Sequence, residues 1–148
     1  MAARALIDTN VLVYRYDSRF PKKQRIADEV LREGISSGTA RIAHQSIVEF
    51  VAATTRGKVE DRLLDMADAR REAEELMAQF PIVYPHDGVL RMALRGTAAY
   101  GLSWFDAHLW AYAEVNGIEE LVSEDFQHGR MYGTVTVRNP FLLHRSPT

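Results

Sequence analysis

The chain has 148 residues, 47% of them hydrophobic and 26% charged, with a formal net charge of -2 at pH 7. This composition is that of one globular domain, residues 1–148, with a sizeable core. The absence of cysteine excludes disulfides and thiolate metal sites and fits a reducing, cytoplasmic location. No apolar run approaches the roughly 20 residues of a membrane span, so we expect neither a transmembrane helix nor a signal peptide.

Short apolar runs alternate with amphipathic segments along the whole chain. Turn and cap residues separate the segments, among them Pro21 at a helix start and Gly101 and Gly117 at helix ends. The predicted elements are, in order, strand 4–8, short helix or turn 10–17, helix 21–35, strand 40–43, helix 46–55, helix 60–79, strand 82–84, helix 87–101, helix 103–117, strand 121–123 and strand 134–137.

Two of the predicted helices begin with Ser followed three residues later by an acid. Ser46 and Glu49 match the capping box, and Ser103 and Asp106 repeat it with Asp in the last position. The second of these helices is apolar nearly all round, which predicts a buried helix. In the helix 87–101, Asp87 is the expected cap, and Val89, Leu90, Ala93 and Leu94 are expected to face inward.

Strands that alternate with helices predict βαβ units. The fold class is therefore α/β, with a mainly parallel sheet of about five strands flanked by helices on both faces. In such a sheet the carboxyl ends of the strands lie on one edge, where Asp8 and Asp125 would be neighbours. Glu49 and Asp106, in the first turns of helices that leave that edge, would face the same crevice.

Four carboxylates that meet in one crevice repel one another unless a cation lies among them. Mg²⁺ and Mn²⁺ prefer oxygen ligands and fill their coordination shells with waters and substrate phosphate. Such a metal lowers the pKa of a bound water and stabilises the leaving oxygen of a phosphodiester. The four acids therefore predict metal-dependent phosphodiester hydrolysis without a covalent enzyme intermediate.

Each acid also has a purely structural interpretation. Asp8 suits the N-cap of the following helix, Glu49 and Asp106 complete capping boxes, and Asp125 suits a turn. The combination favours a shared site, because four acids on four separate elements are placed at one sheet edge.

Other residue types give weaker signals. The histidines lack the spacing of a zinc site. The aromatic residues Trp104, Phe105, Trp110 and Tyr112 are expected in the core rather than stacked on nucleobases. Candidate phosphate contacts, each of which also suits a solvated charge, are Arg15, Arg19, Lys22, Lys23, Arg56, Lys58, Arg62 and Arg130.

At these motifs the sequence resembles the PIN domain superfamily and, within it, the VapC toxins of toxin-antitoxin pairs. The resemblance covers nearly the whole chain and rests on residues 6–14 (LIDTNVLVY), 46–50 (SIVEF), 103–107 (SWFDA) and 121–126 (LVSEDF), with the ending 137–141 (VRNPF) like that of one subgroup.

The resemblance implies a PIN-like three-layer sandwich and a Mg²⁺- or Mn²⁺-dependent endoribonuclease. It also implies a homodimer that a cognate antitoxin protein inhibits. Carried over, Asp8, Asp106 and Asp125 are metal ligands and Glu49 binds metal through water or orients the attacking water. Thr9, Asn10 and Ser123 are supporting hydrogen-bonding residues. Glu124, next to Asp125, is the alternative acid at that strand end.

Two other functions remain open at this point. One is a different Mg²⁺-dependent phosphate hydrolase, such as a haloacid dehalogenase-like phosphatase, which would have a second Asp where Asn10 stands. The other is a PIN-like module that binds RNA or protein without catalysis. The presence of acids at all four positions favours the nuclease.

Overall fold

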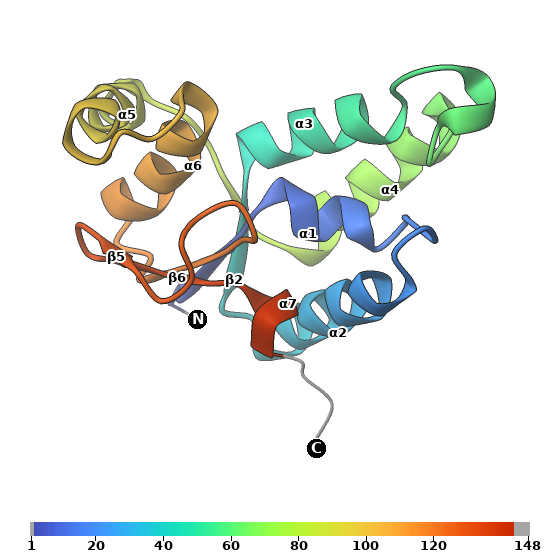
Figure 1. Ribbon diagram of the computed structural model, residues 1–148, viewed down its shortest axis with the longest axis horizontal. Helices are drawn as coiled ribbons and strands as arrows, with labels where there is room; N and C mark the ends of the chain where they lie inside the picture. The colour runs from blue at the N-terminus through green and yellow to red at the C-terminus, as the bar shows by residue number, and fades with distance from the viewer. Residues whose placement is uncertain (1, 144–148) are drawn as a thin grey trace.

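The computed structural model describes residues 2–143, in which helices lie on both faces of a six-stranded sheet (Figure 1). The elements are β1 (Ala5–Ile7), α1 (Thr9–Tyr14), α2 (Pro21–Ser37), β2 (Ala40–Ala43), α3 (His44–Thr54), the 3₁₀ helix η1 (Val59–Asp61), α4 (Met66–Gln79), β3 (Ile82–Val83), α5 (Asp87–Tyr100), α6 (Trp104–Val115), β4 (Glu120–Val122), β5 (Met131–Tyr132), β6 (Val135–Arg138) and α7 (Pro140–Leu143). The predicted α/β class is confirmed.

The order of strands in the sheet places β1 at its centre. The order is β3-β2-β1-β4-β6-β5, and all neighbouring pairs are parallel except β5 with β6. The chain builds outward from β1 through β2 to β3 and then returns to add β4 on the other side of β1. The strand order therefore reverses between β1 and β4, and open α/β sheets bind their ligands at such a point.

Alternate residues of the central strands feed two separate cores. Leu6 of β1 and Leu121 of β4 pack with α5 and α6 on one face. Ile7 and Val122, the next residues along, pack on the other face with α1, α2, α3 and α4. This follows from the two-residue period of a strand, whose successive side chains point to opposite faces. Both faces of β1 are therefore packed against helices, and this packing fixes the position of Asp8 directly after the strand.

The strand β5 was not predicted from the sequence. The sheet therefore contains six strands where about five were expected. Met131 and Tyr132 pair antiparallel with β6 across a tight turn. Two residues are too few for the alternating pattern that identifies a strand. The fourth helix also differs: it begins at Met66, capped by Asp65, and the expected start at residue 60 falls in η1.

The helix α5 differs from its prediction in two ways. His86 caps it, because its ring Nδ1 accepts from the N–H of Gly88, and Asp87 is the first helical residue. Leu90 and Leu94 are exposed, although they were expected to face inward. The reason is that α5 packs mainly on α6, so only the narrow stripe that includes Val89 and Ala93 is covered.

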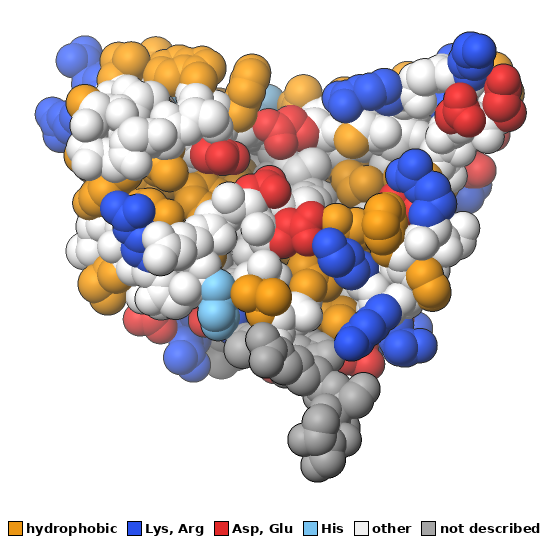
Figure 2. All heavy atoms as spheres, viewed as in Figure 1, with side chains coloured by type: hydrophobic (Ala, Val, Ile, Leu, Met, Phe, Trp, Pro, Cys, Tyr) orange, Lys and Arg blue, Asp and Glu red, His pale blue; other side chains and the backbone are white. Residues whose placement is uncertain are grey.

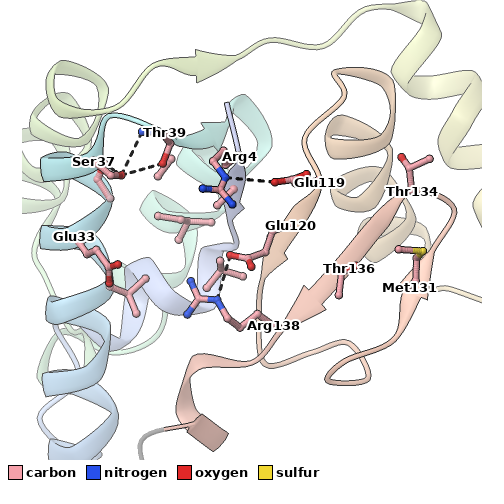
Figure 3. A pocket seen from close by; sticks show the side chains of 16 residues that line it. Arg4, Glu33, Ser37, Thr39, Glu119, Glu120, Met131, Thr134, Thr136 and Arg138 are labelled. Atoms are coloured by element: carbon pink, nitrogen blue, oxygen red, sulfur yellow. Dashed lines mark hydrogen bonds and ion pairs between the residues drawn. The ribbon is translucent and has the colours of Figure 1, made fainter. Parts of the chain in front are cut away.

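A groove of about 510 Å³ lies between α2 and the part of the sheet that no helix covers (Figure 3). Two ion pairs cross its wall, Arg4 with Glu119 at 3.3 Å and Arg138 with Glu120 at 3.1 Å. None of the four candidate acids lines this groove. Among residues 2–143, no helix is both long and apolar enough to cross a lipid bilayer.

Candidate active site at the carboxyl edge of the sheet

Asp8 lies directly after β1, at the point where the strand order reverses. Its side chain is 4% exposed and caps α1, since Oδ1 accepts from the Thr9 N–H at 2.6 Å. Its second oxygen, Oδ2, accepts from the Ser123 hydroxyl at 2.5 Å and from Asn10 Nδ2 at 3.2 Å. The two interpretations of Asp8 are therefore compatible, because the residue that caps the helix also joins the carboxylate cluster.

Ser123 connects the ends of β1 and β4. While its hydroxyl donates to Asp8, the same oxygen accepts the backbone N–H of Asp125 at 3.1 Å. The loop after β4 is thus tied to Asp8, which brings Asp125 to the site as predicted.

The neighbouring acid, Glu124, lies in a separate network. Its carboxylate accepts from the Tyr14 hydroxyl at 2.5 Å and from Lys23 Nζ at 2.8 Å. The Lys23 ammonium also lies 4.8 Å from the centre of the Tyr14 ring. These contacts hold Glu124 between α1 and α2, so Asp125, and not Glu124, carries the free carboxylate beside Asp8. Sequence reasoning missed the part that Tyr14 plays, because the partners are far apart in the chain.

Glu49 reaches the site by a route that the sequence pattern did not predict. The expected capping box is wrong: α3 begins at His44, with Ala43 in the N-cap position, and Ser46 lies inside the helix. The strand β2 runs into α3 without a loop, so the helix starts before Ser46 can cap it. Glu49 consequently lies beyond the first turn, and its Oε2 accepts from the Thr9 hydroxyl at 2.8 Å.

Gln45 links Glu49 to the start of α6. Its amide Nε2 donates to Glu49 Oε1 at 2.8 Å and to the carbonyl of Phe105 at 3.2 Å. Sequence reasoning did not single out Gln45, although its spacing of four residues from Glu49 on one helix is a pairing signal. This amide joins the two sides of the site.

Asp106 occupies the position that its capping box predicts. Ser103 is the N-cap of α6, and its hydroxyl accepts the Asp106 N–H at 3.2 Å. The Asp106 carboxylate also interacts with the Ser103 hydroxyl, which opposes the rise of its pKa. It remains available to the crevice, across which it interacts electrostatically with Asp125 and Glu49.

Asp8 and Asp106 each interact electrostatically with Asp125 and Glu49. Burial raises the pKa of Asp8 from 3.8 to about 7, and the charges of Asp125 and Glu49 add to this effect, while the Ser123 hydroxyl opposes it. Burial also raises the pKa of Asp106, with added repulsion from the same two carboxylates. Between residues 2 and 143, no Lys or Arg forms an ion pair with any of the four.

Figure 2 shows acidic side chains gathered at the middle of one face, in a hollow between the α5–α6 lobe and the α3–α4 lobe. Lys and Arg side chains lie on the α3–α4 side and below it, along the segments that join α1 to α2 and α3 to α4. Several of these cations already have partners, such as Arg19 with Asp17 at 2.8 Å and Arg15 with Asp28 at 3.2 Å.

The donor set of the hollow fits a hard divalent cation. The side chains that donate to Asp8 are a hydroxyl and an amide, and its charged neighbours are carboxylates. Among the described residues, Asn10 Oδ1 is buried without a hydrogen-bond partner. Within the described part of the chain, no group of three or more acidic or histidine side chains is arranged so that it could hold an ion directly. Mg²⁺ binds through one or two carboxylates and keeps several waters, so it suits a site whose acids do not all bind the ion directly.

The aromatic residues near Asp106 divide into two pairs. Trp110 and Tyr112 are buried, as predicted. Trp104 is 41% exposed and Phe105 is 67% exposed, so the expectation that both belong to the core is wrong. Exposure is therefore confined to the first two residues of α6, and the helix is buried from Ala107 to Ala113 apart from His108.

Comparison with known families identifies the family to which the chain belongs. Residues 5–133 match the model of the PIN domain, and the chain belongs to this family, whose members are typically nucleases. A sequence comparison with curated proteins finds no match.

Solved structures with the same fold come from toxin-antitoxin systems. A toxin-antitoxin complex from Klebsiella pneumoniae is 20% identical with a TM-score of 0.65, covering 92% of this chain and 97% of the other. VapBC2 from Rickettsia felis, bound to a DNA fragment from its promoter, is 12% identical with a TM-score of 0.66, covering 94% and 98%. FitAcB from Neisseria gonorrhoeae is 14% identical with a TM-score of 0.65, covering 93% and 98%. These likenesses establish the fold.

Proposed function

We propose that this PIN domain protein is a Mg²⁺- or Mn²⁺-dependent endoribonuclease and the toxin of a VapBC-type toxin-antitoxin pair. The observation that carries the proposal is the carboxylate cluster: four acids from four separate elements meet where the strand order reverses, and within residues 2–143 no Lys or Arg forms an ion pair with any of them. Cellular RNA as the substrate places the proposed activity in the cytoplasm.

In this proposal Asp8, Asp106 and Asp125 hold the metal, either directly or through its bound waters. When bound, the metal supplies positive charge that lowers the pKa of the attacking water and stabilises the leaving oxygen. The Ser123 hydroxyl and the Asn10 amide donate to Asp8 and so favour its ionised form and fix its direction.

Glu49 is proposed to orient the attacking water. Its two oxygens are each fixed by one hydrogen bond, from the hydroxyl of Thr9 and from the amide of Gln45. A carboxylate held on both oxygens stays in place, and each oxygen retains a lone pair that can accept a proton of the water. Thr9 and Gln45 therefore act as positioning residues for Glu49.

The proposed partners are a cognate antitoxin protein and a second copy of the chain. Leu90 and Leu94 lie one helical turn apart on the outer side of α5, and both are exposed. Apolar pairs of this kind on one helix face suit a contact between protein subunits. They support the proposed homodimer.

The test is cleavage of total cellular RNA by the purified protein with Mg²⁺, with Mn²⁺ and with EDTA. Asp8→Asn and Asp106→Asn are the test variants, and Asp87→Asn is the matched control because Asp87 is an exposed acid at another helix start. We expect discrete fragments that require metal, persist in the control and disappear in both test variants. Retained cutting in both purified test variants, with unfolding curves like that of the wild type, would rule the mechanism out.

A different outcome separates the nuclease from a non-catalytic module. If antitoxin has been excluded by mass spectrometry and RNA is bound but not cut with either metal, the protein is a binding module. Turnover of a small phosphomonoester without RNA cleavage would instead indicate a phosphatase.

A further inference from the structure

Phe105 is a large apolar side chain that the fold leaves mostly exposed to solvent. It is 67% exposed. Among the residues that the structure describes, its ring packs against no other aromatic ring and no Lys or Arg lies over it. Its neighbour Trp104 differs, because that ring packs edge-on against His108 at 4.2 Å. Phe105 therefore contributes little buried area to the fold, and its ring is free to contact a ligand.

The backbone of Phe105 is fixed relative to the carboxylate hollow. Its carbonyl accepts from Gln45 Nε2, the same atom that donates to Glu49. On the other side Phe105 is followed directly by Asp106, whose N–H is held by the Ser103 hydroxyl. A single amide group thus connects the residue that carries the free ring to the proposed water-orienting carboxylate.

Both cationic and hydrophobic side chains border the hollow. The α3–α4 side and the segment between α1 and α2 carry Lys and Arg side chains, and hydrophobic side chains border the hollow at the α5–α6 side (Figure 2). Proteins that bind single-stranded nucleic acid combine a cationic track for the phosphates with aromatic rings on which bases stack. The hollow offers both kinds of side chain next to the acids.

We propose that Phe105 is a stacking platform for an unpaired nucleobase adjacent to the phosphate that is cleaved, and that it helps to determine substrate specificity. This inference rests on the proposed ribonuclease function. A base in a duplex has both faces covered by its neighbours, so the platform requires an unpaired nucleotide. The phosphates of that strand would follow the cationic side and its base would turn toward α6.

The first measurement is binding without cleavage. A fluorescent single-stranded oligoribonucleotide, which spans the cleavage site if cutting has been mapped and is otherwise an unstructured sequence of mixed bases, is titrated in Mg²⁺ into Asp8→Asn protein and into the same protein with Phe105→Ala. Stacking on an aromatic ring predicts that Phe105→Ala raises Kd about tenfold. Phe105→Tyr is expected to retain tight binding and Phe105→Leu is expected to lose it, which separates stacking from general hydrophobicity. Met77→Ala, an exposed apolar side chain on α4, is the matched control and should leave Kd unchanged.

The second measurement locates the base. In otherwise wild-type protein, Phe105→Ala is expected to raise KM about tenfold and to change kcat by less than about threefold, because stacking binds ground state and transition state alike. An abasic nucleotide at one position beside the cleaved phosphate should raise KM equally in the wild type. The same abasic substrate should cause no further rise with Phe105→Ala, since the two changes remove one contact.

The possible results separate this inference from the proposed function. Cleavage by the wild type with equal Kd and KM for Phe105→Ala overturns the platform and leaves the nuclease. Weaker binding by Phe105→Ala in a protein that never cuts RNA supports the platform and overturns the nuclease. A change of sedimentation with Phe105→Ala at unchanged Kd would show that the ring belongs to an interface between copies of the chain, which overturns the platform. Absence of RNA binding overturns both.

Discussion

Two segments of this protein share the spacing Ser-x-x-acid, and they fold differently. Ser103 caps α6 and accepts the N–H of Asp106, as the pattern predicts. Ser46 lies within α3, where its hydroxyl is buried without a hydrogen-bond partner. Glu49 is held by the side chains of Thr9 and Gln45 and makes no capping contact with Ser46.

The difference comes from what precedes each helix. A loop precedes α6, so the chain at Ser103 can take the extended backbone conformation of an N-cap residue. No loop separates β2 from α3, and Ala43, the last strand residue, takes the N-cap position instead. A capping pattern therefore predicts a cap only where the chain is free to turn. Glu49 takes no part in capping, so its carboxylate is available to the site.

The largest expected effect tests whether Glu49 is functional or only a link between α1 and α3. Glu49→Gln keeps the size of the side chain but removes its charge and its ability to take a proton. We expect RNA cleavage to fall by roughly a hundredfold or more, because water activation contributes several kcal/mol. The free energy of unfolding, measured with urea, should change by less than about 1 kcal/mol, since the Gln side chain can still accept from the Thr9 hydroxyl. Undiminished cleavage would show that Glu49 has only a structural role. The segments of Glu49 and Asp106 would then differ only in whether their serine caps the helix.

The second prediction uses Asp8, whose charge interacts with that of Glu49. The pKa of Asp8 is raised from 3.8 to about 7 by burial, with contributions from Asp125 and Glu49. The folded protein thus holds this proton more tightly than the unfolded chain, and stability present below about pH 4 is lost as the pH rises to 7. In EDTA, Asp8→Asn should lack this loss, so its stability relative to the wild type should increase over that range, on the order of a few kcal/mol.

The measurement is urea unfolding of both proteins between pH 4 and 8. Addition of Mg²⁺ at pH 8 is expected to raise the stability of the wild type and to leave Asp8→Asn unchanged, because an ion that binds only the folded state stabilises it. A constant difference between the two proteins across the pH range would mean that Asp8 ionises normally in the fold.

The smallest expected effect compares the two serines directly. Ser103→Ala removes a helix cap and should destabilise the protein by about 1 kcal/mol. Ser46→Ala removes a buried hydroxyl that has no partner and introduces a better helix former, so stability should stay the same or rise by roughly 0.5 kcal/mol. Urea midpoints of the two variants provide the check, and equal losses would show that Ser46 has a partner in solution.

Much of the fold was accessible from the sequence. The apolar runs predicted β1 to β4 and β6, and their alternation with helices predicted a parallel sheet with its chemistry at one edge. The order of the acids along the chain then placed Asp8, Glu49, Asp106 and Asp125 at that edge, and the structure brings them together. These predictions succeeded because periodicity and the geometry of parallel sheets depend on local sequence.

Other features depended on packing between distant elements. The sequence left Glu124 as an alternative to Asp125, and only the position of Tyr14 and Lys23 decides which carboxylate is free. The same holds for Leu94 and Phe105, which have the composition of core residues but lie where no other layer covers them. By itself, then, the sequence determined the elements, the parallel sheet and the set of acids. The tertiary structure decided which side chains are covered, paired or free, because coverage depends on how the helices pack around the sheet.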